Sequence, residues 1–215
     1  MTSKLRGRFI TLEGLDGTGK TTHIGLLENF LKDQGIDSIR TREPGGTPLG
    51  EAIRKLLLED SVYCDNDTEL LLLFSARAQH LQSVIYPALE AGRWVLCDRF
   101  TDATFAYQGG GRGVPFRRIE QLEEFVQQGL QPDLTLLLDL PLEQGLARAT
   151  ERGRLTDRFE RLDLGFRKRV RQAYMNRQQE SGNRFRLIDA TGSVKQVQAA
   201  IQDQVKLFIS LDPHK

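Results

Sequence analysis

A glycine-rich turn between an apolar segment and an amphipathic segment constrains this chain more than any other feature. The turn follows the pattern Gly-x-x-x-x-Gly-Lys-Thr over residues 14–21, directly after the apolar run Phe9–Leu12. Beyond it, apolar residues recur at helical spacing, at Ile24, Leu26, Leu27, Phe30 and Leu31. A glycine-rich turn without a ligand is the alternative, but a strand, this turn and a helix in that order indicate a phosphate-binding P-loop.

Each residue type in the turn suits the binding of phosphate. Glycines allow backbone conformations that other residues resist, so successive N–H groups can converge on phosphate oxygens. Lys20 supplies a mobile positive charge, and the Thr21 hydroxyl can ligate Mg²⁺. The positive end of the following helix dipole points at the same anion. The predicted nucleotide-phosphate site consists of Gly14, Leu15, Asp16, Gly17, Thr18, Gly19, Lys20, Thr21 and Thr22.

Composition limits the remaining classes of protein. The 215 residues are enough for one sizeable α/β domain, which we expect to span residues 1–215. A net charge of +1 gives no global electrostatic case for binding nucleic acid or a membrane surface. No apolar run reaches the ~18 residues of a membrane helix, and the basic N-terminus lacks the apolar region of a signal peptide. Cys64 and Cys97 lack metal-ligand spacing, and because no export signal is recognised we expect them to be reduced thiols in a cytoplasmic protein.

Short apolar segments alternate with helical ones along the whole chain. The predicted strands are Phe9–Leu12, Ser38–Thr41, Trp94–Cys97, Leu134–Leu140 and Phe185–Ile188. This alternation predicts an α/β fold of three layers, with a five-stranded parallel sheet flanked by helices. Ligands of such sheets bind beyond the carboxyl ends of the strands. Polar residues stand at those ends: Glu13, Asp16, Arg42, Glu43, Asp98, Arg99, Asp189 and Thr191.

The longest predicted helix runs roughly over Thr68–Glu90. Asn66, followed three residues later by Glu69, resembles a capping box at its start. Residues 70–74 are apolar on nearly all sides, so we expect this helix to be widely buried or packed against a partner subunit. Pro87 near its end can kink the last turn.

Two pairs of residues outside the P-loop are candidates for ligand binding. Asp98, at the end of an apolar strand, can hold Mg²⁺ directly or through water, or it can cap the next segment. Arg99 can clamp a second phosphate bidentately, or it can be a surface arginine. Phe74 and Arg77 share one helix face, where core and solvent roles are the simpler interpretation, although this pair would also suit a nucleotide base.

An arginine-rich segment follows the fourth strand. Its arginines are Arg148, Arg152, Arg154, Arg158 and Arg161. A solvated charged surface is one interpretation. The other is a lid over residues 148–161, approximately, that brings arginines onto a transferring phosphate; Gly153 would allow the hinge motion.

Four motifs, taken together and in order, resemble the bacterial thymidylate kinase family. They are Glu13–Thr22, Arg42–Thr47, Asp98–Phe100 and Ala106–Gly113, which lie within residues 13–113. The resemblance implies a P-loop kinase fold, a homodimer, and transfer of the γ-phosphoryl group of ATP to dTMP in dTTP biosynthesis. ATP and Mg²⁺ are thus the expected cofactors, and dTMP the expected small-molecule partner.

The resemblance also implies roles for residues of the P-loop and of the loop after the fifth strand. Lys20, Thr21 and the loop backbone would bind the ATP phosphates, and Asp16 would lie near the sugar 3′-hydroxyl and the metal. The loop from Asp189 to Ser193, which contains Thr191, would lie near adenine. Arg148 is also expected among the residues that bind ATP.

The implied dTMP site draws on several motifs. Arg99 would contact the dTMP phosphate, Phe74 would stack on thymine, and Arg77 would hydrogen-bond to a thymine carbonyl. Tyr107 would crowd a ribose 2′-hydroxyl and so favour deoxynucleotides. The other residues expected in this site are Glu43, Pro44, Thr104 and Gln108.

One departure concerns the source of the catalytic arginine. Some family members have a basic residue at the position of Thr18, and this chain does not. It therefore resembles the subgroup whose lid supplies that arginine. Arg152 and Arg158 match the family's lid best, and Arg154 matches it less well.

Two alternatives remain open. A P-loop switch or regulatory protein would bind nucleotide without catalysis, but a GTP-binding switch needs an Asn-Lys-x-Asp motif, and the fourth strand ends in Asp139-Leu140-Pro141. A binding-only protein would also need neither a second phosphate clamp nor an arginine lid. The closer alternative is a kinase for another nucleoside monophosphate.

Overall fold

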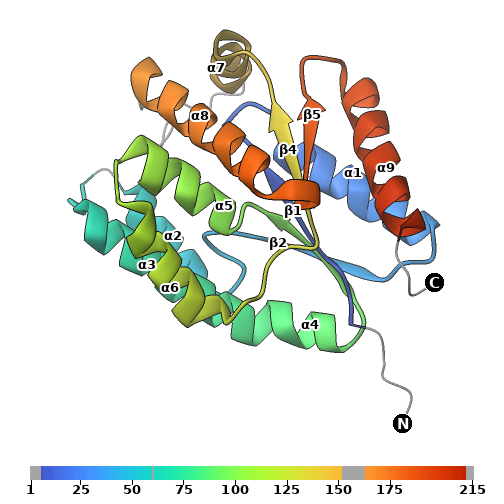
Figure 1. The fold of residues 1–215 in the computed structure, drawn as a ribbon, viewed down its shortest axis with the longest axis horizontal. Helices are drawn as coiled ribbons and strands as arrows, with labels where there is room; N and C mark the ends of the chain where they lie inside the picture. The colour runs from blue at the N-terminus through green and yellow to red at the C-terminus, as the bar shows by residue number, and fades with distance from the viewer. Residues whose placement is uncertain (1–5, 60, 152–162, 212–215) are drawn as a thin grey trace.

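The computed structural model describes residues 6–59, 61–151 and 163–211. Within them, five strands form one parallel sheet in the order β2-β3-β1-β4-β5, which confirms the predicted fold class (Figure 1). The strands are β1 (Phe9–Glu13), β2 (Ser38–Arg42), β3 (Trp94–Asp98), β4 (Leu134–Asp139) and β5 (Phe185–Asp189). The strand that leads into the P-loop is therefore central.

The register of the sheet brings the predicted polar residues to one edge. Asp98, the last residue of β3, pairs with Leu12 of β1 and with Arg42 of β2. Asp139 of β4 pairs with Asp189 of β5 in the same way. Since all five strands are parallel, their carboxyl ends share this edge, and the candidate site lies there.

Helices cover both faces of the sheet, as Figure 1 shows. On one face, α1 (Lys20–Asp33) and α9 (Val194–Ser210) pack over Ile10, Leu12 and the inward residues of the neighbouring strands. The opposite face is covered by the end of the long helix and by α8 (Leu164–Glu180). The alternation of side chains along each strand thus places apolar clusters on both faces of the sheet.

The remaining helices lie between and after the strands. They are α2 (Pro48–Leu58), α5 (Thr101–Thr104), α6 (Phe116–Gln127) and α7 (Leu142–Glu151), together with the π-helical segment η2 (Phe105–Gly111) and the short 3₁₀ helix η3 (Gly182–Arg184). None of the helices in the described residues is long and apolar enough to cross a membrane.

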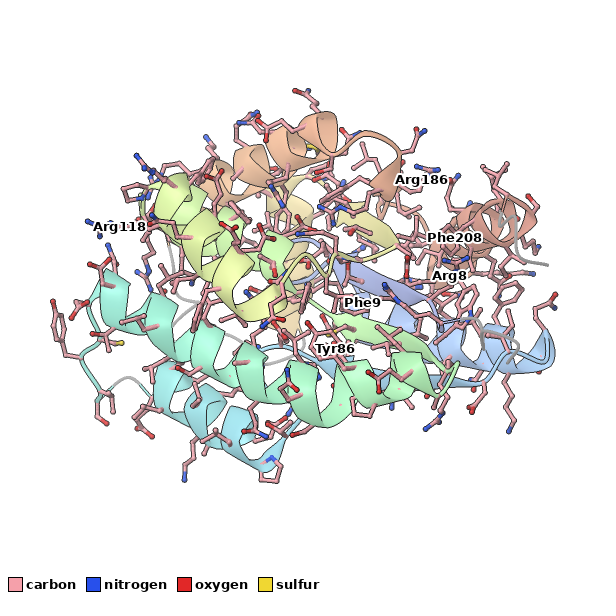
Figure 2. The ribbon with its side chains drawn as sticks, turned by 60° about the horizontal axis from the view of Figure 1, so that its bottom comes forward. Arg8, Phe9, Tyr86, Arg118, Arg186 and Phe208 are labelled. Atoms are coloured by element: carbon pink, nitrogen blue, oxygen red, sulfur yellow. The ribbon has the colours of Figure 1, made fainter. Side chains whose placement is uncertain are left out.

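Side chains at the two faces illustrate the packing. Phe9 of β1 and Tyr86, both labelled in Figure 2, belong to one apolar cluster on the same side of the sheet. The Tyr86 hydroxyl donates to the Gln127 carbonyl at 3.0 Å. On the other side, Phe208 of α9 packs edge-on against Trp94, with ring centroids 6.0 Å apart.

The long helix differs from the prediction in its start and its interior. It comprises α3 (Asn66–His80), the π-helical segment η1 (Leu81–Ile85) and α4 (Tyr86–Glu90), so the irregular turn lies directly before Pro87. The predicted capping box is wrong. Asp65 is the N-cap and accepts the Thr68 N–H at 2.9 Å. Glu69 is fully buried and bonds to Gln108, so it does not turn back to the cap.

Two consecutive glycines in η2, Gly110 and Gly111, let α8 approach closely. A Cβ atom at Gly110 would lie 2.5 Å from Ala173 Cβ, and one at Gly111 would lie 2.4 Å from Phe166 Cζ. Such distances are too short for real side chains, so only glycine permits this contact. As a consequence, Tyr174 of α8 reaches the carboxyl end of β1.

Candidate active site

The P-loop has the backbone that its sequence predicts. Gly14, Gly17 and Gly19 all have positive φ, of 132°, 86° and 92°, where glycine is strongly favoured. A Cβ at Gly14 would lie 2.3 Å from the Leu138 carbonyl oxygen, and one at Gly17 would lie 2.2 Å from that of Gly145. The loop is thus held closely against β4 and α7, and α1 begins directly after it at Lys20.

Lys20 lies folded across this loop. Its Nζ donates to the carbonyl oxygens of Gly14 at 3.0 Å and Leu15 at 2.9 Å. Burial lowers the pKa of Lys20 to about 8, and the Arg99 guanidinium contributes to this, while Asp16 and Asp98 oppose it. A buried ammonium group beside a second cation favours an anionic ligand, which would restore its charge balance.

Thr21 and Asp98 meet at the end of the loop. The Thr21 hydroxyl donates to Asp98 Oδ2 at 3.1 Å. No group of three or more His, Cys, Asp or Glu residues that could hold a metal ion occurs in the described residues. A hydroxyl and a carboxylate are oxygen ligands of the type that Mg²⁺ prefers when phosphate oxygens and water complete its shell. These two residues therefore fit the predicted ion.

Arg99 is held at the centre of the candidate site. Its Nη2 donates to Asp16 Oδ1 at 2.6 Å, and its Nη1 donates to the Gly14 carbonyl at 3.0 Å. The hydroxyls of Tyr107 and Tyr174 lie 3.1 and 3.2 Å from the same guanidinium group. Burial alone would raise the pKa of Asp16, but Arg99 and Lys20 lower it to about 2. The carboxylate thus stays ionised and fixes Arg99 beside the P-loop.

A pocket opens beside Arg99 and contains most of the residues predicted for the second substrate. The predicted residues in its lining are Asp16, Glu43, Pro44, Arg77, Arg99, Thr104, Tyr107 and Gln108. Phe74 is not among the lining residues; it is buried, and the Arg77 guanidinium lies 4.7 Å from its ring centroid. The predicted contact of Phe74 with a base stays a prediction.

Arg77 is almost fully buried in the wall of this pocket. Its Nε donates to Glu43 Oε2 at 2.7 Å, and its Nη2 donates to Thr104 Oγ1 at 3.0 Å. Glu43 is held in turn by His80, whose Nδ1 lies 3.0 Å from Oε1. The Nη1 atom of Arg77 is buried and has no hydrogen-bond partner among the described residues. Since buried donors are normally paired, this atom indicates a missing acceptor.

The predicted adenine-side residues are brought together at the other end of the P-loop. Arg148 of α7 donates to the carbonyl oxygens of Ala190 at 2.8 Å and Thr191 at 3.1 Å. The Thr191 N–H donates to Asp189 Oδ1 at 2.9 Å. Arg152, Arg154, Arg158 and Arg161 lie outside the described residues, so their predicted role stays a prediction.

Several residues of the site were not predicted. Arg54 lines the pocket and donates to the Pro44 carbonyl at 3.1 Å. It lies four residues before Leu58, another lining residue, so both lie on one face of α2. This spacing could have indicated that Arg54 belongs to the pocket. Tyr174 could have been noticed as an aromatic residue in the very polar α8. No local pattern indicates the contacts of His80.

The buried carboxyl group of Glu13 should make the free energy of unfolding depend on pH. Its carboxyl group accepts the Phe100 N–H at 2.7 Å and the Tyr174 hydroxyl at 2.8 Å. Burial, assisted by Asp102, raises the pKa of Glu13 from an ordinary 4.5 to about 8. The folded state then binds more protons than the unfolded state between these values, so the free energy of unfolding should fall as pH rises from about 4.5 to about 8.

Urea unfolding at several pH values between 5 and 8 tests this prediction. Glu13→Gln should flatten the decline because the side chain no longer titrates. Glu51→Gln is the control: Arg42 lowers the pKa of this half-exposed carboxyl, so the wild-type decline above pH 5 should remain. Equal slopes for Glu13→Gln and the wild type would contradict the assignment.

Comparisons with known proteins agree with this geometry. Residues 12–201 match the family model described as thymidylate kinase. The chain is 59% identical over 198 residues to the thymidylate kinase of Ectopseudomonas mendocina, covering 92% of this chain and 94% of the relative. It is 54% identical over 196 residues to that of Chromobacterium violaceum, covering 91% and 92%. The crystal structure of thymidylate kinase from Ehrlichia chaffeensis superposes with a TM-score of 0.77 at 32% identity, covering 94% of this chain and 99% of that one. This chain therefore belongs to the thymidylate kinase family.

Proposed function

We propose that this chain transfers the γ-phosphoryl group of ATP to dTMP, giving dTDP and ADP. The observation that carries this proposal is the pocket next to the P-loop, which is lined by Arg77, whose buried Nη1 is unpaired, and by Arg99. The first is a donor suited to a base carbonyl, and the second is a cation suited to a monophosphate. Membership of the thymidylate kinase family supports the choice of base.

On the acceptor side, the residues divide into binding and orienting groups. Arg99 would bind the dTMP phosphate while Asp16 holds its guanidinium group in place, 2.6 Å away. Arg77 would donate to the thymine carbonyl, with Glu43 and Thr104 fixing its orientation. Tyr107, whose hydroxyl is held by Arg99, would limit the space beside the sugar and so favour deoxynucleotides.

On the donor side, the P-loop backbone and Lys20 would bind the β- and γ-phosphates of ATP. Lys20 would give up its two hydrogen bonds to loop carbonyl oxygens and donate to phosphate oxygens instead. Thr21 and Asp98 would hold Mg²⁺, which supplies positive charge against the phosphate oxygens when it is bound. Arg148 would steady the loop at Asp189 and Thr191 against the adenine ring. A cytoplasmic location stays a prediction.

An assay of ADP release against five acceptors tests the proposal. The acceptors are dTMP, dUMP, dCMP, dGMP and UMP. We expect the highest kcat/KM for dTMP, and a loss of ~10–100-fold with dTMP in Arg77→Met, because the base carbonyl then loses its buried donor. Higher activity with another base would favour the alternative of a different nucleoside monophosphate kinase. Nucleotide binding without turnover on any acceptor would favour a non-catalytic regulator.

A second prediction separates the two proposed roles of arginine. Arg152 or Arg158 should act on the charge of the transferring phosphoryl group, so its replacement by Ala should lower kcat by ~10³-fold or more. Arg99→Ala should instead raise the KM for dTMP, because this contact already exists in the ground state. Arg118→Ala is the control, since Arg118 pairs with Asp67 on the surface (Figure 2). Near wild-type kcat in Arg152→Ala, Arg158→Ala and the double variant would refute the lid proposal.

A third prediction concerns assembly. We infer that the chain forms a C2 homodimer through α3, because Leu71 in its apolar stretch is 55% exposed while Leu70 and Phe74 are buried. Light scattering should give about twice the chain mass of 24.4 kDa, and Leu71→Asp should shift the mass toward one chain. A wild-type monomer at micromolar concentration is the contrary result.

A further inference from the structure

Glu69 is a fully buried carboxylate that lies behind the base pocket. It belongs to α3 and is not among the residues that line the pocket. Its Oε1 accepts a hydrogen bond of 2.9 Å from Nε2 of Gln108, a residue that does line the pocket. Arg112 pairs with Glu69 at 3.3 Å, which supplies the positive charge that a buried carboxylate needs.

This contact determines which way the Gln108 amide faces. An ionised carboxylate can only accept hydrogen bonds, so the NH₂ end of the amide must be turned toward Glu69. The opposite atom, Oε1, makes no hydrogen bond with any described residue. The amide therefore offers an acceptor, and not a donor, to a molecule in the pocket.

The pocket thus offers one donor and one acceptor of fixed orientation. The donor is the buried Nη1 of Arg77, and the acceptor is Oε1 of Gln108. The imide edge of thymine or uracil presents the complement, a carbonyl oxygen next to an N–H group. Cytosine presents the reverse, an amino group next to a bare ring nitrogen, and would place donor against donor and acceptor against acceptor.

We propose that Glu69 is a positioning residue that makes the pocket select a pyrimidine imide over cytosine by fixing the Gln108 amide. This inference rests on the proposed function and adds to it the residue that orients one of the two groups facing the base. Glu69 acts through Gln108 and does not touch the substrate. A purely structural role would change stability, or turnover of both nucleotides alike, without changing their ratio.

The test is the ratio of kcat/KM for dTMP to kcat/KM for dCMP in Glu69→Gln. The new amide has nearly the same shape but can donate as well as accept, so the Gln108 amide is free to turn over. We expect this ratio to fall ~10-fold or more, through a higher KM for dTMP and a lower KM for dCMP, with kcat for dTMP changed less. Asp67→Asn, an exposed substitution on the same helix, should keep the wild-type ratio.

Gln108→Met provides the second arm, because it removes the amide and leaves Glu69 in place. It should lower the ratio by itself, and Glu69→Gln added to it should produce no further fall. A wild-type ratio in folded Glu69→Gln, or an equal effect of Glu69→Gln with and without Gln108, would overturn the proposal. Should Glu69→Gln not fold, a wild-type ratio in Gln108→Met would overturn it equally. Failure of the proposed function is distinct: the wild type would then not phosphorylate dTMP.

Discussion

The close placement of two cations, the buried Lys20 and the partly buried Arg99, at the carboxyl edge of the sheet is the constraint on which the rest of the site depends. Like charges in a medium of low dielectric repel strongly. Here the repulsion is offset by Asp16, by carbonyl oxygens of the P-loop and by two tyrosine hydroxyls. Three features of the fold place these compensating groups. They are the central position of β1, the glycines that bring α8 close, and the register that aligns Asp98 with β1.

The pocket beside Arg99 follows a similar rule, in which two of its polar side chains are fixed by buried partners. Glu43 and Thr104 hold Arg77, and Glu69 holds Gln108. Because these partners are already paired in the protein, little ordering remains to be done when a nucleotide binds, which favours both affinity and discrimination. Burying the carboxylates of Glu43 and Glu69 is unfavourable, and their ion pairs with Arg77 and Arg112 offset this.

Local patterns were sufficient for the sheet and for the P-loop. Apolar runs and the glycine turn predicted all five strands within one or two residues, and the order of the motifs brought Asp16, Arg99 and Tyr107 into one site. Contacts between distant residues could not be predicted, because no periodicity encodes them. Tyr174 reaches Glu13 across 161 positions, and Gln108 reaches Glu69 across 39. For the same reason the sequence suggested a capping role for Glu69, whereas the fold places that side chain behind the pocket.

In the proposed function, one pocket binds the base through Arg77 and the phosphate through Arg99. The most direct test is a crystal structure of the protein with dTMP bound. We expect a thymine carbonyl oxygen within hydrogen-bond distance of Arg77 Nη1, with the dTMP phosphate on the Arg99 guanidinium group in the same pocket. A phosphate bound away from Arg99, or a thymine ring whose carbonyl does not meet Arg77 Nη1, would contradict it.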